Sequence, residues 1–128
     1  MNILGIGVDI VETKRIESSI ERFGERFLQR VFLDAEVDYC KSMKHSARHF
    51  AARFAAKEAV SKAFGTGIGG QMGWRDIEVR RKESGEPFIV LHGGAKELAR
   101  TLLVQETLVS LSHSNDYAAA NAIVICRQ

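Results

Sequence analysis

Charged side chains recur at helical spacing between His49 and Gly65 of this 128-residue sequence, and their types suit the binding of phosphate groups. When each residue is turned by about 100°, Glu58 and Lys62 fall on one flank of a narrow apolar line and Arg53 and Lys57 fall on the other. Arg53 and Lys57 are like charges four residues apart, an arrangement that an anion between them would stabilise. The segment therefore predicts one wall of a site, although a solvated helix with a single ion pair explains the same pattern.

A second carboxylate, Asp9, lies in the apolar run 3–11, which predicts a buried strand. Alternation puts the large apolar residues on one face and Asp9 beside two glycines on the other. That face is open to a close neighbour, unless Asp9 is only a strand-end residue that turns into the next helix. Two carboxylates with no cysteine nearby suit a hard cation such as Mg²⁺, which also binds phosphate oxygens.

These groups together are the parts of a phosphoryl-transfer site. Asp9 and Glu58 would hold the metal, and His113 lies at a predicted strand end. Three basic residues would hold the phosphates, namely Arg53, Lys57 and Lys62. A metal and basic groups neutralise charge in such a site while a nucleophile is positioned in line.

Two flanking segments add basic or flexible groups. A bend containing Lys44, His45 and Arg48 precedes the helix, and the glycine-rich loop 65–70 follows it. His45 and His49 are four residues apart, a spacing that also occurs in zinc sites. Because no further metal ligands accompany them, histidines that face solvent or a phosphate are favoured over a zinc site. The loop lacks the Lys-Ser or Lys-Thr pair of a Walker A motif, although its N–H groups could form an anion-binding nest.

The elements that must position these groups follow from periodicity and from helix and turn signals. The alanine-rich segment 49–65 contains no proline and ends at a glycine, which predicts one long helix. Thr13 predicts the N-cap of a helix that kinks or pauses at Gly24, and Asp34 predicts the cap of a short helix over 35–43. Strands are predicted over 76–80, 88–91, 108–113 and 118–125, with a helix near 95–102. We expect one α+β domain over residues 1–128, with an antiparallel β-sheet packed against a long central helix and shorter helices.

Arginines recur along the helix that begins at Thr13. If that helix is continuous, Arg15, Arg22 and Arg26 form a narrow row with Arg30 nearby, and glutamates lie on the far side. Guanidinium groups pair bidentately with carboxylates, so the row suits an acidic partner. A solvated face is the other explanation of the same pattern.

Composition narrows the class of protein further. The net charge of +2 mixes 18 basic with 16 acidic residues, which does not indicate nucleic acid. Two cysteines without CxxC spacing indicate reduced thiols. The N-terminal apolar run is short, carries an acidic residue and lacks a basic lead, so it predicts neither a signal peptide nor a membrane span. We expect a cytoplasmic protein with no nucleic-acid or membrane partner.

Three motifs resemble holo-acyl carrier protein synthase, the short bacterial type of 4′-phosphopantetheinyl transferase. They begin with Gly7-Val-Asp9-Ile-Val-Glu-Thr-Lys-Arg15-Ile, continue with Phe50-Ala-Ala-Arg53-Phe-Ala-Ala-Lys57-Glu58-Ala-Val-Ser-Lys62-Ala-Phe-Gly65, and end with Ser110-Leu-Ser-His113 followed by Tyr117-Ala-Ala-Ala. The match covers nearly the whole chain in the right order. It implies an enzyme of fatty acid and lipid biosynthesis that moves the phosphopantetheine arm of coenzyme A onto a serine of apo-acyl carrier protein. The implied by-product is adenosine 3′,5′-bisphosphate, and the implied cofactor is Mg²⁺.

The resemblance also implies a role for each matching position. Asp9 and Glu58 match the metal-binding carboxylates, and Lys62 matches a lysine that steadies the leaving phosphate or donates a proton to it. The carrier protein's serine would be the nucleophile, and Glu58, directly or through a metal-bound water, is the preferred base. The positions that match groups around coenzyme A are Arg53, His113 and Gly65, with Lys44, His45 and Arg48 as a seat for its 3′-phosphate.

The family further implies partners and an assembly. Acyl carrier proteins are acidic, so Arg15, Arg22 and Arg26 would be their docking strip. Members resemble trimers with sites between subunits, which predicts that the glycine-faced strand meets a helix of the next subunit. The alternative function is a non-catalytic module that binds coenzyme A, another nucleotide or an acidic protein. Carboxylates among the lysines favour the enzyme, and mild charge disfavours a third hypothesis, a small RNA-binding protein.

Overall fold

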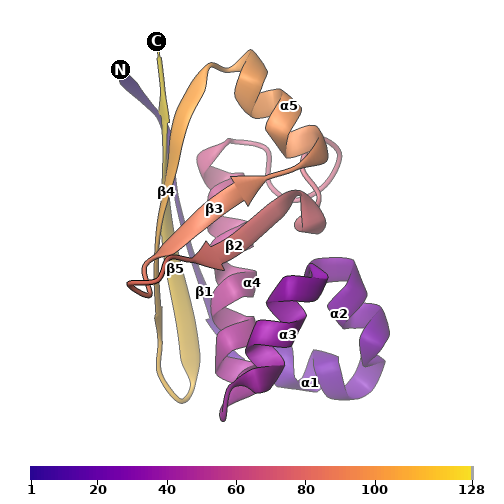
Figure 1. Ribbon diagram of the computed structural model, residues 1–128. Helices are drawn as coiled ribbons and strands as arrows, with labels where there is room; N and C mark the ends of the chain where they lie inside the picture. The colour runs from indigo at the N-terminus through magenta and orange to yellow at the C-terminus, as the bar shows by residue number, and fades with distance from the viewer. Residues whose placement is uncertain (128) are drawn as a thin grey trace.

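Strand β1 (Asn2–Glu12) and helix α4 (Ser46–Ala63) lie against each other at the centre of the protein. The structure, a computed structural model, describes residues 1–127. β1 pairs antiparallel with β5 (Tyr117–Cys126), which pairs antiparallel with β4 (Val104–His113). α4 packs against one face of this sheet (Figure 1). The arrangement confirms the predicted α+β class with an antiparallel sheet against a long helix.

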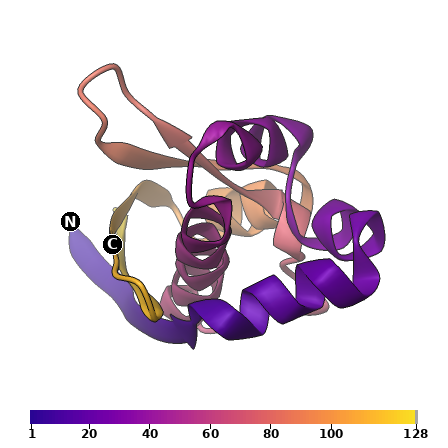
Figure 2. The ribbon, with the colours of Figure 1, turned by 90° about the horizontal axis from the view of Figure 1, so that it is seen from below.

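Helix α4 is buried on almost every side, which accounts for its richness in alanine. From Phe50 to Phe64 every residue is buried except Glu58, which is half-buried, and Lys62, which is exposed. Figure 2 shows α4 between the sheet and the N-terminal helices. A helix with apolar residues all round is a buried helix rather than a surface one. The solvated-helix explanation is therefore wrong, and Glu58 and Lys62 mark the one opening in this part of α4.

Two glycines in β1 let α4 approach the strand closely. A Cβ placed on Gly7 would lie 1.9 Å from the carbonyl oxygen of Ala59, and one on Gly5 would lie 2.0 Å from the carbonyl oxygen of Ala63. Real side chains do not tolerate such distances to backbone atoms, so only glycine fits. The glycine face of β1 thus packs against a helix of the same chain. The prediction that it meets a helix of the next subunit is wrong.

The other face of β1 carries large apolar side chains that the described residues leave largely uncovered. Five of them are exposed, at 37% to 67% of their surface: Ile3, Leu4, Ile6, Val8 and Ile10. The sequence predicted a buried strand, but the apolar face of β1 is exposed in the single chain. The prediction is therefore wrong for this face. Contiguous exposed apolar surface of this kind marks an interaction site.

Three short helices follow β1 and pack around α4. Helix α1 (Thr13–Phe23) and helix α2 (Glu25–Val31) are separated by Gly24, whose φ of 54° falls in the left-handed region. The chain therefore breaks at Gly24, and the arginine row is not carried by one continuous helix. Helix α3 (Asp34–Ser42) begins one residue earlier than predicted. Thr13 is the first residue of α1 rather than its N-cap.

A two-stranded hairpin forms the second sheet. It consists of β2 (Ile77–Arg81) and β3 (Pro87–Leu91), which pair antiparallel and lie within one residue of the predicted strand bounds. The short helix η1 (Trp74–Asp76) precedes it and α5 (Gly93–Thr101) follows it. β2 contacts α3 and α4, and β3 contacts β4 (Figure 1). The hairpin therefore closes a side of α4 that the main sheet leaves open.

A buried ion pair joins the N-terminal helices and the hairpin to α4. Lys57 Nζ donates to Glu36 Oε1 at 2.8 Å and to the carbonyl oxygens of Val31 and Trp74 at 2.9 and 3.1 Å. The other carboxylate oxygen of Glu36 accepts the N–H of Val79 at 2.7 Å. Both charged side chains are at most 1% exposed. The ammonium group is thus fully engaged in the core, and the prediction that Lys57 holds a phosphate is wrong.

Candidate active site

The predicted carboxylates and lysine come together where α4 opens beside β1. Lys62 Nζ donates to Asp9 Oδ1 and to the carbonyl oxygen of Val8, both at 3.1 Å. The Asp9 side chain is 17% exposed and that of Lys62 50% exposed, so the group borders solvent. Glu58 lies one helical turn before Lys62 on the same face of α4. Lys62 is therefore paired with Asp9, on the neighbouring strand, and not with Glu58.

The environment of Glu58 favours its neutral form. Burial raises the pKa of the Glu58 carboxyl above its usual range, and the negative charge of Asp9 raises it further. The positive charges of Lys62 and Arg15 oppose this shift in the pKa of Glu58. A carboxylate with a raised pKa is a better base, and a nearby cation would return it to its charged form.

The donor set of this cluster fits a divalent cation of the Mg²⁺ type. Asp9 and Glu58 offer hard carboxylate oxygens and repel each other, which a cation between them would relieve. Within residues 1–127 no group of three or more histidine, cysteine, aspartate or glutamate residues is arranged to hold a metal. Mg²⁺ characteristically takes one or two carboxylates and fills its other positions with water and phosphate oxygens.

A second cluster of predicted residues lies on a different side of α4. The guanidinium carbon of Arg53 is 4.3 Å from the ring centre of Tyr39, and the rings of His49 and His113 have centres 5.0 Å apart. The ring of Tyr39 also meets that of His49, at 5.9 Å. Burial lowers the pKa of both histidines, and the positive charge of Arg81 lowers it further. The structure thus brings Arg53 and His113 into one basic cluster.

The two groups of predicted residues lie on different faces of α4. The Asp9 cluster consists of Asp9, Glu58 and Lys62. The Arg53 cluster consists of Arg53, Tyr39, His49 and His113. Arg53 and Glu58 are five positions apart on α4, which corresponds to about 140° around the helix axis. Glu58 interacts with groups of β1 and α1, whereas Arg53 contacts a ring of α3. Both sets of predicted residues are therefore assembled, but on different faces of one chain.

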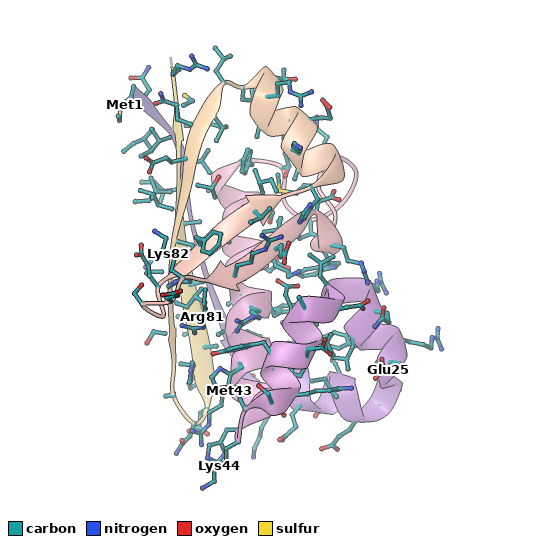
Figure 3. The ribbon with its side chains drawn as sticks, in the orientation of Figure 1. Met1, Glu25, Met43, Lys44, Arg81 and Lys82 are labelled. Atoms are coloured by element: carbon teal, nitrogen blue, oxygen red, sulfur yellow. The ribbon has the colours of Figure 1, made fainter. Side chains whose placement is uncertain are left out.

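The basic bend before α4 lines a cavity of about 330 Å³. Lys44, His45 and Arg48 contribute to its wall, together with the start of α1 and the turn between β4 and β5. Thr13 also lines it, and the Thr13 Oγ1 atom is buried without a hydrogen-bond partner among residues 1–127. In Figure 3, Lys44 lies at the lower end of the molecule and Arg81 lies higher, at the end of strand β2. The predicted cluster of three basic residues is thus present, next to the histidine pair.

The glycine-rich loop 65–70 is not a nest of free N–H groups. The N–H of Gly65 donates to the carbonyl oxygen of Lys62 at 2.9 Å, and those of Thr66 and Gly67 both donate to that of Ser61, at 3.1 and 3.2 Å. The N–H of Gly69 is also bonded, to the carbonyl oxygen of Met72. The nest hypothesis is therefore wrong for these four amides. Gly65 remains close to the opening in α4, just after the helix ends.

The predicted docking arginines are all exposed, and the break at Gly24 gives them a different setting. Arg15 lies beside Glu58, with its guanidinium carbon 5.7 Å from the ring centre of Phe54. Arg22 lies over the exposed ring of Phe23 at 5.4 Å. Arg26 lines a groove of about 240 Å³ with Ser19, Phe23, Phe27 and Arg30. The strip therefore runs from an apolar groove with a basic rim to the edge of the Asp9 cluster.

Sequence reasoning missed Tyr39 and Arg81 in the second cluster. Tyr39 comes from α3 and Arg81 from β2, and both guanidinium groups, those of Arg53 and Arg81, face the same ring. Their proximity depends on how α3 and the hairpin pack against α4. The only local sign is that Tyr39 lies three residues after Glu36 in a short helix, so the two share a face.

Comparison with known proteins agrees with this geometry. Residues 5–122 match the family described as the 4′-phosphopantetheinyl transferase superfamily. A holo-[acyl-carrier-protein] synthase of Koribacter versatilis is 49% identical over 122 residues, which cover 95% of this chain and 98% of that protein. One from Moorella thermoacetica is 51% identical over 122 residues, which cover 95% and 94%.

Solved structures give the same result. A holo-[acyl-carrier-protein] synthase from Neisseria meningitidis superposes with a TM-score of 0.90 at 31% identity, covering 97% of this chain and 99% of that one. The Helicobacter pylori enzyme, solved in complex with coenzyme A, gives a TM-score of 0.84 at 35% identity, covering 94% and 99%. Within residues 1–127, no helix combines the length and hydrophobicity needed to cross a membrane. The chain therefore belongs to the 4′-phosphopantetheinyl transferase superfamily, within its holo-[acyl-carrier-protein] synthase group.

Proposed function

We propose that this protein transfers the 4′-phosphopantetheine group of coenzyme A to a serine of apo-acyl carrier protein and releases adenosine 3′,5′-bisphosphate. The observation that carries the proposal is the opening in α4 where Glu58 and Lys62 meet Asp9. Two carboxylates beside an ammonium group suit phosphoryl transfer, whereas a module that only binds anions gains nothing from the carboxylates. The likeness to proteins solved with coenzyme A supports coenzyme A as the donor.

The reaction exchanges one phosphorus–oxygen bond for another. The serine oxygen bonds to the phosphorus nearest the pantetheine arm, and that phosphorus loses its bond to the oxygen that leaves with the nucleotide. Glu58, half-buried at the opening of α4, accepts the serine proton, directly or through a water molecule. Lys62 is half-exposed beside Asp9 and neutralises charge on the leaving phosphate.

We propose that Asp9 and Glu58 hold a Mg²⁺ ion. When bound there, the ion would supply positive charge to the pyrophosphate of coenzyme A. Asp9 keeps Lys62 oriented through its hydrogen bond, so the lysine and the carboxylates act on the same phosphate group. Chelation should accordingly abolish transfer.

We further propose that coenzyme A binds between two chains of a homotrimer. Arg53, His113, Lys44 and Arg48 would hold the nucleotide end, with Gly65 near the phosphates. Because the Arg53 cluster and the Asp9 cluster face apart in one chain, a neighbouring chain would bring the first to the second. The cytoplasm, where coenzyme A and carrier proteins meet, is the expected compartment.

The uncovered face of β1 supports the assembly. Its apolar residues continue onto the rest of the sheet, where Leu108 is 45% and Tyr117 48% exposed. A second copy of the chain would remove this surface from water, at about 25 cal/mol per Å². The variant Ile6→Glu should therefore give monomers in native mass spectrometry, and Ile6→Val should keep the assembly. A trimer that survives Ile6→Glu would contradict this interface.

We propose that apo-acyl carrier protein docks on the arginine strip. Arg15, Arg22 and Arg26 present exposed guanidinium groups to an acidic helix, and the groove lined by Phe23 and Phe27 accepts an apolar side chain. Arg15 lies next to Glu58, so a partner on this strip would have its serine close to the carboxylates. Docking and chemistry are thus on one continuous surface.

The test is the intact mass of apo-acyl carrier protein after incubation with this protein and coenzyme A, with Mg²⁺ or with a chelator. We expect a gain of one phosphopantetheine that disappears with the chelator. A carrier mass that never changes, with several carriers and with coenzyme A still binding, would support a non-catalytic binding module instead. Transfer that persists in chelator would contradict the metal role alone.

A further inference from the structure

The basic cluster on α4 contains a buried guanidinium, that of Arg53, which interacts with the Cys40 side chain but has two nitrogens without a partner among the described residues. Arg53 is only 2% exposed, yet its Nε and Nη1 have no hydrogen-bond partner among residues 1–127. Buried polar groups are nearly always paired, because an unpaired one costs the full penalty of its desolvation. The closest aromatic group is the ring of Tyr39, whose centre lies 4.3 Å from the guanidinium carbon. The charge of Arg53 is therefore met by an aromatic face and not by a carboxylate.

The carboxylates near Arg53 are already occupied by other groups. A cavity of about 420 Å³ is lined by Arg53, Tyr39, Glu36 and Glu78 among others. Glu36 is bonded to Lys57 and to two backbone N–H groups. Glu78 accepts two hydrogen bonds from Arg80, at 2.9 and 3.1 Å, and is 2.8 Å from the His92 ring nitrogen. No carboxylate of this wall is left to neutralise Arg53.

A second guanidinium faces the same ring. Arg81, on the hairpin, has its guanidinium carbon 5.7 Å from the ring centre of Tyr39, and it also lines the cavity. Two like charges around one ring repel each other unless an anion lies near both. The cavity thus has the electrostatics of an anion site, with Tyr39 at the centre of its basic groups.

We propose that Tyr39 is a positioning residue that holds Arg53 ready to bind a phosphate of coenzyme A, an inference that rests on the proposed function. The face of an aromatic ring attracts a cation without using its N–H groups, whereas a carboxylate would occupy them. Nε and Nη1 of Arg53 therefore have no described protein partner that a phosphate would have to displace. Glu36 lies one turn before Tyr39 on α3 and is hydrogen-bonded to Lys57 and to the N–H of Val79. These bonds anchor the helix that carries the Tyr39 ring.

The test compares Tyr39→Leu, which removes the ring, with Tyr39→Phe, which keeps it and removes the hydroxyl. We expect Tyr39→Leu to raise KM for coenzyme A by roughly 10-fold with kcat unchanged, because a desolvated cation–π contact is worth that much in binding. Tyr39→Phe should match the wild type. Calorimetry with adenosine 3′,5′-bisphosphate should show the same loss of affinity for Tyr39→Leu. If Tyr39→Leu fails to fold, Tyr39→Met fills the space without a ring and takes its place.

A double-mutant cycle shows whether Tyr39 acts through Arg53. In an Arg53→Gln background, Tyr39→Leu should cause no further loss of affinity, because the residue it positions is gone. An equal loss in both backgrounds, a fall in kcat at unchanged KM, or a loss in Tyr39→Phe as large as in Tyr39→Leu would overturn the proposal. Nucleotide binding is measured without any carrier protein, so it does not depend on transfer. A wild type that binds the nucleotide but transfers nothing would count against the proposed function, and the binding data would still test the role of Tyr39.

Discussion

Removing the ammonium group of Lys57 should destabilise the protein strongly. In Lys57→Met, the Glu36 carboxylate loses its cation, and the carbonyl oxygens of Val31 and Trp74 lose a donor in the core. Breaking a fully buried ion pair from one side costs about 3 to 5 kcal/mol of unfolding free energy, because the remaining charge is left buried without a partner. The magnitude applies here because both side chains are at most 1% exposed.

This cost converts into a measurable shift of the melting temperature. An unfolding entropy of about 2.1 cal/mol/K per residue gives about 0.27 kcal/mol/K for 128 residues. Lys57→Met should therefore melt about 11 to 19 °C below the wild type when unfolding is followed by far-UV circular dichroism. Protein concentration is held constant, since self-association would change the apparent stability.

The matched control is the same substitution further along α4. Lys62 is also bonded to a carboxylate, but its side chain is 50% exposed. Exposed pairs contribute less than about 1 kcal/mol, so Lys62→Met should melt within about 4 °C of the wild type. Similar small shifts for both variants would refute the reasoning that burial makes the Lys57 pair critical.

Three further predictions concern packing, pH and docking. Gly7→Ala should lower the free energy of unfolding, measured in urea, by more than about 3 kcal/mol, because its Cβ would lie 1.9 Å from a backbone oxygen of α4. The control Gly70→Ala has open space around its Cβ and should lower it by less than about 1 kcal/mol. Because burial and the charge of Asp9 raise the pKa of Glu58 in the metal-free protein, the affinity for Mg²⁺ measured by calorimetry should fall as pH falls through that raised pKa, since the proton and the cation compete for the same carboxylate. An affinity that stays constant down to the range of an ordinary carboxyl would contradict this assignment. Arg22→Glu should raise KM for acyl carrier protein about 10-fold at low salt with KM for coenzyme A unchanged, and Arg100→Glu, on exposed α5, should not. Equal effects of the two charge reversals would argue against a defined docking strip.

Much of the fold was predictable because its signals are local. The long alanine-rich helix and the hairpin turn both follow from short stretches of sequence, and each appears within a few residues of its predicted bounds. Asp9, Glu58 and Lys62 were also predictable as a group, since two motifs carry them and helical spacing joins the last two.

The errors arose where long-range packing decides the outcome. Lys57 has the same local pattern as Lys62, and only its contact with Glu36, 21 residues earlier, shows that it belongs to the core. The alternation in β1 separates two faces correctly but does not say which one meets α4, because large apolar side chains usually mark the buried face, whereas here the glycines meet α4 and the apolar side chains are exposed. The turn at Gly24 depends on a positive φ that helix periodicity does not record.

In the proposed assembly, one transferase site combines the Asp9 cluster of one chain with the Arg53 cluster of its neighbour. The most direct test mixes two defective chains, Glu58→Gln and the double variant Arg53→Gln, His113→Ala, after native mass spectrometry confirms that they exchange subunits. With coenzyme A below its wild-type KM, each variant alone should be nearly inactive. Random mixing should restore about a quarter of the sites, since that fraction pairs two intact halves across an interface. Mixed assemblies with no more activity than the average of the two variants would contradict a shared site.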